Sequence, residues 1–87
     1  MVIYCKINRI KFAFSNIDGL LEFNRYNEIT CLDCSYNELT KLPELPSTLR
    51  ELHCLRNELT KLPELPTTLR KINCSSIIIT NIKLLQQ

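Results

Sequence analysis

Two nearly identical stretches decide the fold of this chain: NELTKLPELPSTLR at residues 37–50 and NELTKLPELPTTLR at residues 57–70. They differ only at Ser47 and Thr67. The second stretch begins 20 residues after the first, since 57 − 37 = 20. Similarity at a fixed short offset is the sequence signature of a repeat architecture, in which each copy forms one structural unit.

The same offset extends beyond these two stretches. Two further positions are apolar at this spacing, and they hold Leu32, Leu52, Ile72, Cys34, Cys54 and Cys74. In the third copy, Ile77 replaces the asparagine, and Lys83 and Gln86 replace the prolines. We therefore divide the chain into residues 1–28, a degenerate N-terminal repeat or cap, and residues 29–87, about three repeats of which the last is degenerate.

Local patterns predict the secondary structure of each copy. Leu52 and Cys54 alternate with Glu51, His53 and Leu55, a period of two that is typical of a strand with one buried face. We expect parallel, in-register strands near Leu32, Leu52 and Ile72. Residues 61–67 contain two prolines, which remove backbone donors, so this segment is expected to be extended rather than helical.

Each unit reads L-x-x-L-x-C-x-x-N-x-L-x-x-L-P-x-L-P, which resembles the short, 20-residue LPxLP form of the leucine-rich repeat over about residues 29–82. Such repeats occur in secreted bacterial effectors and in proteins of large DNA viruses. The resemblance implies an α/β right-handed leucine-rich-repeat solenoid with parallel strands on its concave side. Its convex side would be extended or polyproline-like, with little helix.

The concave face is the usual contact surface of such solenoids. Nine outward positions on the expected strands are therefore the candidate binding residues: Cys31, Asp33, Ser35, Glu51, His53, Leu55, Lys71, Asn73 and Ser75. Asn37 and Asn57 follow the strands where the chain turns, and an amide there can satisfy backbone groups. We assign these two to a structural asparagine ladder.

Five cysteines raise the question of metal or redox chemistry. Cys31 and Cys34 form a C-x-x-C, but alternation along a strand places them on opposite faces, so we expect no metal site. The column of Cys34, Cys54 and Cys74 is expected to hold buried free thiols, with a disulfide inside the column as the alternative. The role of Cys5 stays open.

Cys31, Asp33 and His53 have the residue types of a nucleophile, an orienting acid and a base. An open strip of three strands supplies no oxyanion site, so we expect a polar solvated face, no enzyme and no cofactor. In place of a catalytic base, we expect His53 to be a surface residue whose side chain contacts Asp33.

Composition limits the remaining partners. The 45% hydrophobic and 23% charged residues are proportions of a globular chain, and 87 residues allow one core. A net charge of +2 and the absence of a long apolar run predict neither nucleic-acid nor membrane binding. Charges of both signs repeat at the 20-residue offset and indicate a solvated convex surface: Lys41, Glu44, Arg50, Lys61, Glu64 and Arg70. With no secretory signal, an intracellular location is favoured, cytoplasmic or in a host cytoplasm.

We therefore expect a non-catalytic protein-interaction module whose partner is a protein. The alternative is a structural or relic fragment of a longer leucine-rich-repeat protein that mainly self-associates. Ile77, Ile78 and Ile79 form an apolar run at the expected open end, which favours self-association through that edge.

Overall fold

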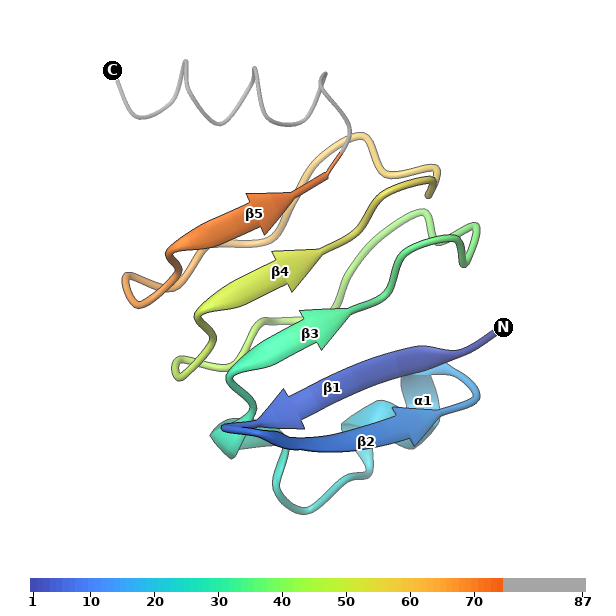
Figure 1. Ribbon diagram of the computed structural model, residues 1–87. Helices are drawn as coiled ribbons and strands as arrows, with labels where there is room; N and C mark the ends of the chain where they lie inside the picture. Colours follow the sequence, from blue (N-terminus) through green and yellow to red (C-terminus); the bar gives the residue numbers. More distant parts are fainter. Residues whose placement is uncertain (75–87) are drawn as a thin grey trace.

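The structure, a computed structural model, describes residues 1–74. Its five strands form one mixed sheet in the order β2-β1-β3-β4-β5 (Figure 1). Helix α1 and the short 3-10 helix η1 lie between β2 and β3. Among residues 1–74, no helix is long and apolar enough to cross a membrane. The elements are β1 Ile3–Ile7, β2 Ile10–Phe14, α1 Ile17–Leu21, η1 Tyr26–Glu28, β3 Cys31–Asp33, β4 Glu51–His53 and β5 Lys71–Asn73.

The first two strands form an antiparallel hairpin. Only two residues separate Ile7 from its partner Ile10. The first of them, Asn8, has a φ of 57°, in the left-handed region that asparagine tolerates well. Strand β1 also pairs antiparallel with β3, which places Cys5 opposite Leu32. The hairpin therefore occupies the edge of β3 that faces away from β4.

The other two pairings of the sheet are parallel. Leu32 lies opposite Leu52, and Leu52 lies opposite Ile72, so the 20-residue offset places equivalent residues side by side. This part of the expectation matches the structure. Residues 41–46 and 61–66 belong to neither helix nor strand, as the prolines require.

The expected fold class is nevertheless wrong. The described residues form a small open mixed sheet, not a right-handed leucine-rich-repeat solenoid, because two of its pairings are antiparallel. The physical reason lies in Ile3–Ile7 and Ile10–Phe14, two alternating segments around a short turn, which are typical of a hairpin. "Leucine-rich repeat" and "solenoid" therefore do not describe this fold, and the division of the chain at residue 28 stays a prediction.

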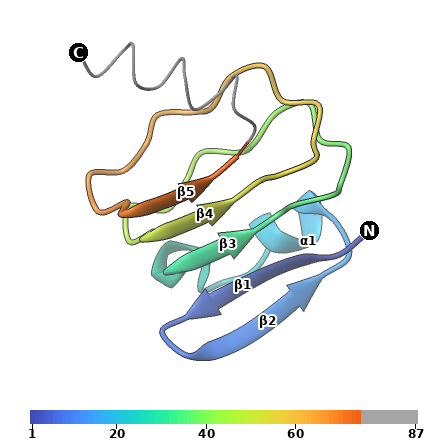
Figure 2. The ribbon, with the colours of Figure 1, turned by 45° about the horizontal axis from the view of Figure 1, so that its top comes forward.

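The core lies on one face of the sheet. Its largest strand residues, Ile3, Leu32 and Leu52, have no exposed surface. Leu20 of α1 and Leu49 of the loop before β4 belong to the same cluster. Figure 2 shows that the loops after β3 and β4 return on the side of the sheet where α1 lies. The opposite face, which we call the outer face, is not covered by any other element of residues 1–74.

Asparagine amides hold the turns that follow β3 and β4. The Asn57 Oδ1 atom accepts hydrogen bonds from the backbone N–H of Asn37 at 3.0 Å and of Leu39 at 2.8 Å. The Asn57 Nδ2 atom donates to the carbonyl of Cys34 at 2.8 Å. Asn37, which is only 3% exposed, donates to three carbonyls, including that of Val2 at 3.0 Å. These two side chains thus bridge neighbouring segments beyond the strand ends.

Threonine hydroxyls play the matching part before β4 and β5. Thr48 Oγ1 donates to the carbonyl of Ile29 at 2.7 Å, and Thr68 Oγ1 donates to that of Leu49 at 2.7 Å. Because the strands contain only three residues each, these bonds supply pairing that the short ladders cannot. Neither threonine was predicted from the sequence to have this role.

We expect Leu52→Ala to lower the free energy of unfolding by about 2 to 5 kcal/mol, because truncating a buried leucine removes apolar contacts and leaves a cavity. Leu55→Ala is the matched control, since Leu55 is half-exposed beyond the same strand and should cost at most about 1 kcal/mol. Urea unfolding followed by circular dichroism measures both. Equal losses would show that the inner and outer faces are wrongly assigned.

Candidate functional site

The outer face carries rows of side chains from neighbouring strands. One row contains Lys6, Cys31, Glu51 and Lys71, which are register partners across β1, β3, β4 and β5. The next row contains Tyr4, Asp33, His53 and Asn73 by the same pairings. Ser35 and Leu55 follow β3 and β4, and the backbone N–H of Leu55 donates to Ser35 Oγ at 3.1 Å. Ser75 lies outside the described residues, as do Ile77, Ile78 and Ile79.

The hairpin adds residues that the sequence analysis missed. Tyr4 and Lys6 of β1 extend both rows beyond β3. Lys11 of β2 places its Nζ atom 4.1 Å from the centroid of the Tyr4 ring, a cation–π contact. The alternation of Ile3, Cys5 and Ile7 with polar residues was the available signal, because it assigns Tyr4 and Lys6 to the face opposite the core.

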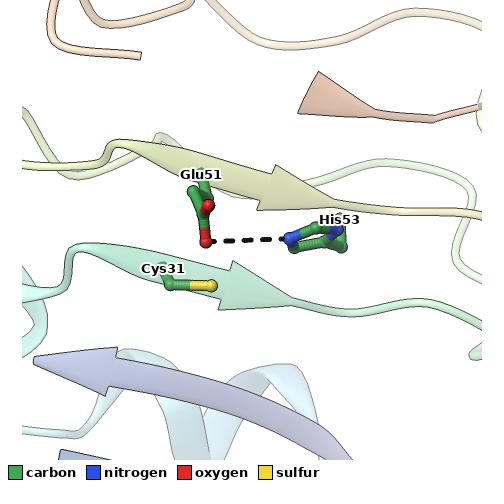
Figure 3. Close-up of side chains that lie close together, drawn as sticks. All are labelled: Cys31, Glu51 and His53. Carbon is green, nitrogen blue, oxygen red and sulfur yellow. Dashed lines mark ion pairs between the residues drawn. The ribbon is translucent and has the colours of Figure 1, made fainter. Parts of the chain in front are cut away.

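Cys31, Glu51 and His53 come together at the centre of the outer face (Figure 3). Their candidate ligand atoms all lie within 4.8 Å of one another. His53 Nε2 lies 4.0 Å from Glu51 Oε2, and the His53 side chain is 22% exposed. From the sequence we expected His53 to contact Asp33, but Asp33 Oδ1 accepts a hydrogen bond from the backbone N–H of Ser35 at 3.1 Å. The structure therefore assigns the carboxylate contact of His53 to Glu51.

The environment of Cys31 keeps its thiol protonated. Burial, followed by a hydrogen bond with the Glu51 side chain, raises the pKa of Cys31 to about 11. The negative charges of Glu51 and Asp33 act in the same direction, and Lys6 acts against them. A nucleophilic cysteine needs the opposite shift, because the thiolate is the reactive form. This arrangement is therefore unlike that of a thiol catalyst.

A shallow hollow of about 220 Å³ lies over this cluster, between β1 and β4. Besides the three clustered residues, its lining includes Tyr4, Lys6, Lys11 and Asp33. A small molecule or the side chain of a larger partner can therefore reach the three polar groups from the solvent side.

A tyrosine patch lies at one end of the outer face, where β3 and β4 end. We define it as Val2, Tyr4, Tyr36 and Leu55, which line a hollow of about 300 Å³ together with polar neighbours. Tyr36 is 71% exposed and Tyr4 is 38% exposed. Tyr36 also has a φ of 62°, a conformation that is uncommon for a bulky residue. Neither tyrosine was among the binding residues predicted from the sequence.

A basic groove lies at the opposite end, where the hairpin turns and β3, β4 and β5 begin. Its volume is about 470 Å³, and its cationic lining residues are Lys6, Arg9, Arg50, Arg70 and Lys71. Glu51 is its one acidic lining residue. From the sequence we placed Arg50 and Arg70 on a convex surface of mixed charge, whereas they directly precede β4 and β5 and line this groove with Lys6 and Lys71. A chain with a small net charge thus has one locally positive end.

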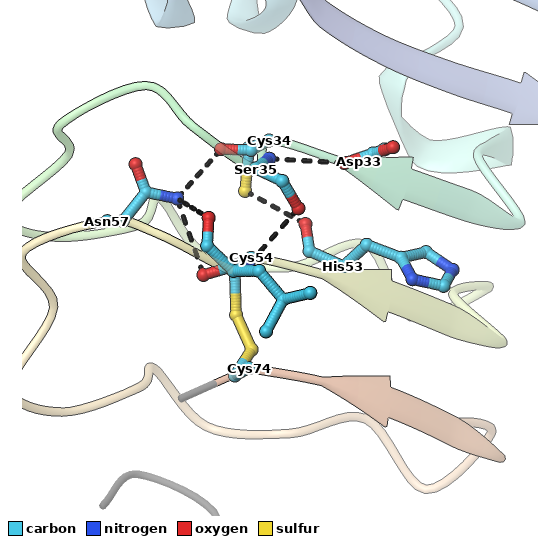
Figure 4. Close-up of a disulfide and its surroundings, with 8 residues drawn as sticks. Asp33, Cys34, Ser35, His53, Cys54, Asn57 and Cys74 are labelled. Atoms are coloured by element: carbon cyan, nitrogen blue, oxygen red, sulfur yellow. Dashed lines mark hydrogen bonds between the residues drawn. A yellow bond between two sulfur atoms is a disulfide. The ribbon is translucent and has the colours of Figure 1, made fainter. Parts of the chain in front are cut away.

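The cysteine column differs from its expected state. Cys54 and Cys74 form a disulfide, whereas the sequence analysis favoured free thiols (Figure 4). Their Cα atoms are 4.8 Å apart, within the range of about 4.4 to 6.8 Å that a disulfide spans. Parallel neighbours in register are therefore close enough for a disulfide, and the alternative of a bond within the column is the one that the structure contains.

The other three cysteines are free thiols. Cys34 is buried at the top of the column, and its Sγ lies 3.5 Å from the carbonyl oxygen of His53. Cys31 is half-buried on the outer face, so it and Cys34 lie on opposite faces of the sheet. Cys5, whose role was open, is buried in β1 opposite Leu32 and serves as packing.

No protein-family model matches this chain, and no match was found among the curated proteins or the solved structures.

We expect the oxidised chain, denatured without reductant, to show three reactive thiols, and five after reduction, because Cys54 and Cys74 are paired. Colorimetric thiol titration measures both counts. Cys74→Ser should raise the unreduced count to four (five cysteines less one, none paired) and lower stability by about 3 kcal/mol, the value for a loop of this length. Five thiols in the unreduced wild-type chain would exclude the disulfide.

Alkaline pH should destabilise the fold in part through Cys34. Burial, and to a lesser extent the Asp33 carboxylate, raises the pKa of the Cys34 thiol from 9.0 to about 12. Between these values the folded state binds more protons than the unfolded state, so stability falls as the pH rises. Urea midpoints measured from pH 8 upward should therefore decrease less steeply for Cys34→Ala than for the wild type. Parallel curves for the two proteins would contradict this assignment.

Proposed function

We propose that this chain is a non-catalytic protein-binding domain whose contact surface is the outer face of the sheet. The observation that carries the proposal is the tyrosine patch, in which Tyr4 and Tyr36 expose aromatic surface beside Leu55. Tyrosine is enriched among the residues that contribute most to protein interfaces, because it offers a large and rigid contact area with one polar tip. The core-facing residues of the same strands are buried and offer no such surface.

The charge of the outer face indicates the chemistry of the partner. The basic groove lies at the end of the face opposite the tyrosine patch. A protein segment that crosses the sheet between them would place acidic residues in the groove and apolar residues on the patch. Complementary charge of this kind speeds association and fixes the orientation of the bound segment.

The protonated state of Cys31 supports a binding role over an enzymatic one, because a thiol with a pKa of about 11 is a poor nucleophile near neutral pH. The absence of nucleic-acid and membrane binding, and an intracellular location, remain predictions. The Cys54–Cys74 disulfide speaks against a reducing intracellular compartment, because such compartments keep thiols reduced. Self-association through Ile77, Ile78 and Ile79 also remains a prediction, and it falls outside the described residues.

A photo-crosslinking amino acid placed at position 36 tests the proposal. In an extract of the source cell we expect a discrete adduct with a second protein, which excess wild-type chain suppresses. A competitor carrying Tyr36→Ser and Leu55→Ser should suppress it at least about tenfold less well, because losing an aromatic anchor commonly costs 2 kcal/mol or more, on the order of 30-fold in affinity.

The matched control places the same crosslinker at position 21, because Leu21 is exposed in α1 and lies away from the outer face. It should give no such adduct. The proposal is wrong if positions 21 and 36 give the same adducts, or if the double variant, folded by circular dichroism, competes as well as the wild type. An adduct between two copies of this chain would favour self-association instead.

A further inference from the structure

We propose that Cys31, Glu51 and His53 form a binding site for a zinc ion at the centre of the outer face. This goes beyond the proposed protein binding and does not depend on it, because the three ligands come from one chain. The sequence analysis expected no metal here, since it considered only the pair Cys31 and Cys34. The cross-strand arrangement of the three residues provides a different ligand set.

The backbone holds the three side chains in position. Cys31 and Glu51 are register partners on the parallel strands β3 and β4. Glu51 and His53 are two residues apart on β4 and therefore point to the same face. Ligands on strands are held more precisely than ligands on loops. Figure 3 shows the sulfur, the carboxylate and the imidazole directed toward a common space between β3 and β4.

The separation of the ligand atoms fits a zinc ion after small side-chain rotations. The Cys31 sulfur, a Glu51 oxygen and a His53 nitrogen lie within 4.8 Å of one another. Tetrahedral zinc has bonds of about 2.0 to 2.3 Å, which places its ligand atoms roughly 3.5 Å apart. Each side chain is half-buried on the surface, so shifts of about 1 Å meet little resistance.

The three donor types together favour zinc over other common cations. Thiolate and imidazole are preferred by zinc, whereas Mg²⁺ and Ca²⁺ prefer sites made only of oxygen. Without metal the Cys31 thiol holds its proton; on binding, the positive charge of the ion displaces that proton to the solvent and the sulfur bonds to the metal, with no change of oxidation state. The thiolate and the Glu51 carboxylate then balance the two positive charges of the ion.

Three protein ligands leave the fourth tetrahedral position open. The shallow hollow over the cluster lies on the solvent side, and Tyr4, Lys11 and Asp33 contribute to its walls. A water molecule or a side chain of a bound protein can occupy this position. The site is thus an open one, unlike the closed four-ligand sites that hold small folds together.

Titration of the 87-residue chain with Zn²⁺ in the presence of a chromophoric chelator tests the proposal. The chain is kept under anaerobic conditions with its disulfide intact. We expect one zinc ion per chain, which excess Mg²⁺ does not displace. Co²⁺ serves as a spectroscopic probe and should show a thiolate-to-cobalt charge-transfer band together with the intense d–d absorption of a four-coordinate ion.

Substitutions separate this site from other thiols and acids. Cys31→Ser should abolish the charge-transfer band, and Glu51→Gln and His53→Gln should each weaken Zn²⁺ binding at least tenfold, since even the loss of an outer hydrogen-bond partner costs about 10- to 100-fold. Cys34→Ala is the matched thiol control, and Asp18→Asn, at an exposed position of α1, is the matched acid control; both should bind within about threefold of the wild type.

The proposal fails if the chain binds less than one zinc ion per molecule, or if Cys31→Ser retains the charge-transfer band. It also fails if His53→Gln and Glu51→Gln, folded by circular dichroism, bind Zn²⁺ as tightly as the wild type. These readouts need no protein partner, so they stand apart from the crosslinking test of the outer face.

Discussion

The hydrogen bonds of the Asn57 amide are the interaction on which the parallel part of the sheet depends. Strands of three residues form few ladder bonds, and Asn57 continues the connection by bonding both N–H groups and carbonyls of the preceding segment. Asn37 bonds in the same way to the start of the hairpin through the carbonyl of Val2. Its own Oδ1 atom is buried without a partner among the described residues. This unused acceptor marks the point where the parallel pattern ends, because β1 runs antiparallel and presents no equivalent turn.

The composition of the outer face follows from the register that these bonds maintain. A shift of one residue between β3 and β4 would turn Leu32 outward and Cys31 into the core, so the grouping of Cys31 with Glu51 exists only in the observed register. The disulfide between Cys54 and Cys74 fixes the next pairing covalently. Threonine hydroxyls before β4 and β5 hold the opposite ends of the same strands. The site is therefore supported at both ends of its strands.

The sequence predicts the parallel pairing of Leu32, Leu52 and Ile72, because an exact offset between equivalent residues requires equivalent environments. It also predicts which residues face outward, since alternation decides that locally. The hairpin was not predicted, because residues 1–28 were assigned only to a degenerate repeat or a cap, without use of the alternation in Ile3–Ile7. The disulfide could not be predicted, because a spacing of 4.8 Å suits both packed thiols and a bond. Whether His53 contacts Glu51 or Asp33 depends on side-chain rotamers, and the order of residues in the sequence does not determine these rotamers.

The two proposals concern one surface, which connects them thermodynamically. The zinc ligands lie between the tyrosine patch and the basic groove, so a segment crossing the face passes over the open coordination position. A partner that supplies the fourth ligand gains a metal bond only when zinc is bound. By linkage, zinc then raises the affinity for the partner by the same factor by which the partner raises the affinity for zinc. A partner that covers the hollow without bonding to the ion gains no metal bond, so it leaves the affinity for zinc, and its own affinity, without this coupling. The coupling between the two affinities therefore distinguishes a zinc ion that joins two proteins from one that only stiffens β3 and β4.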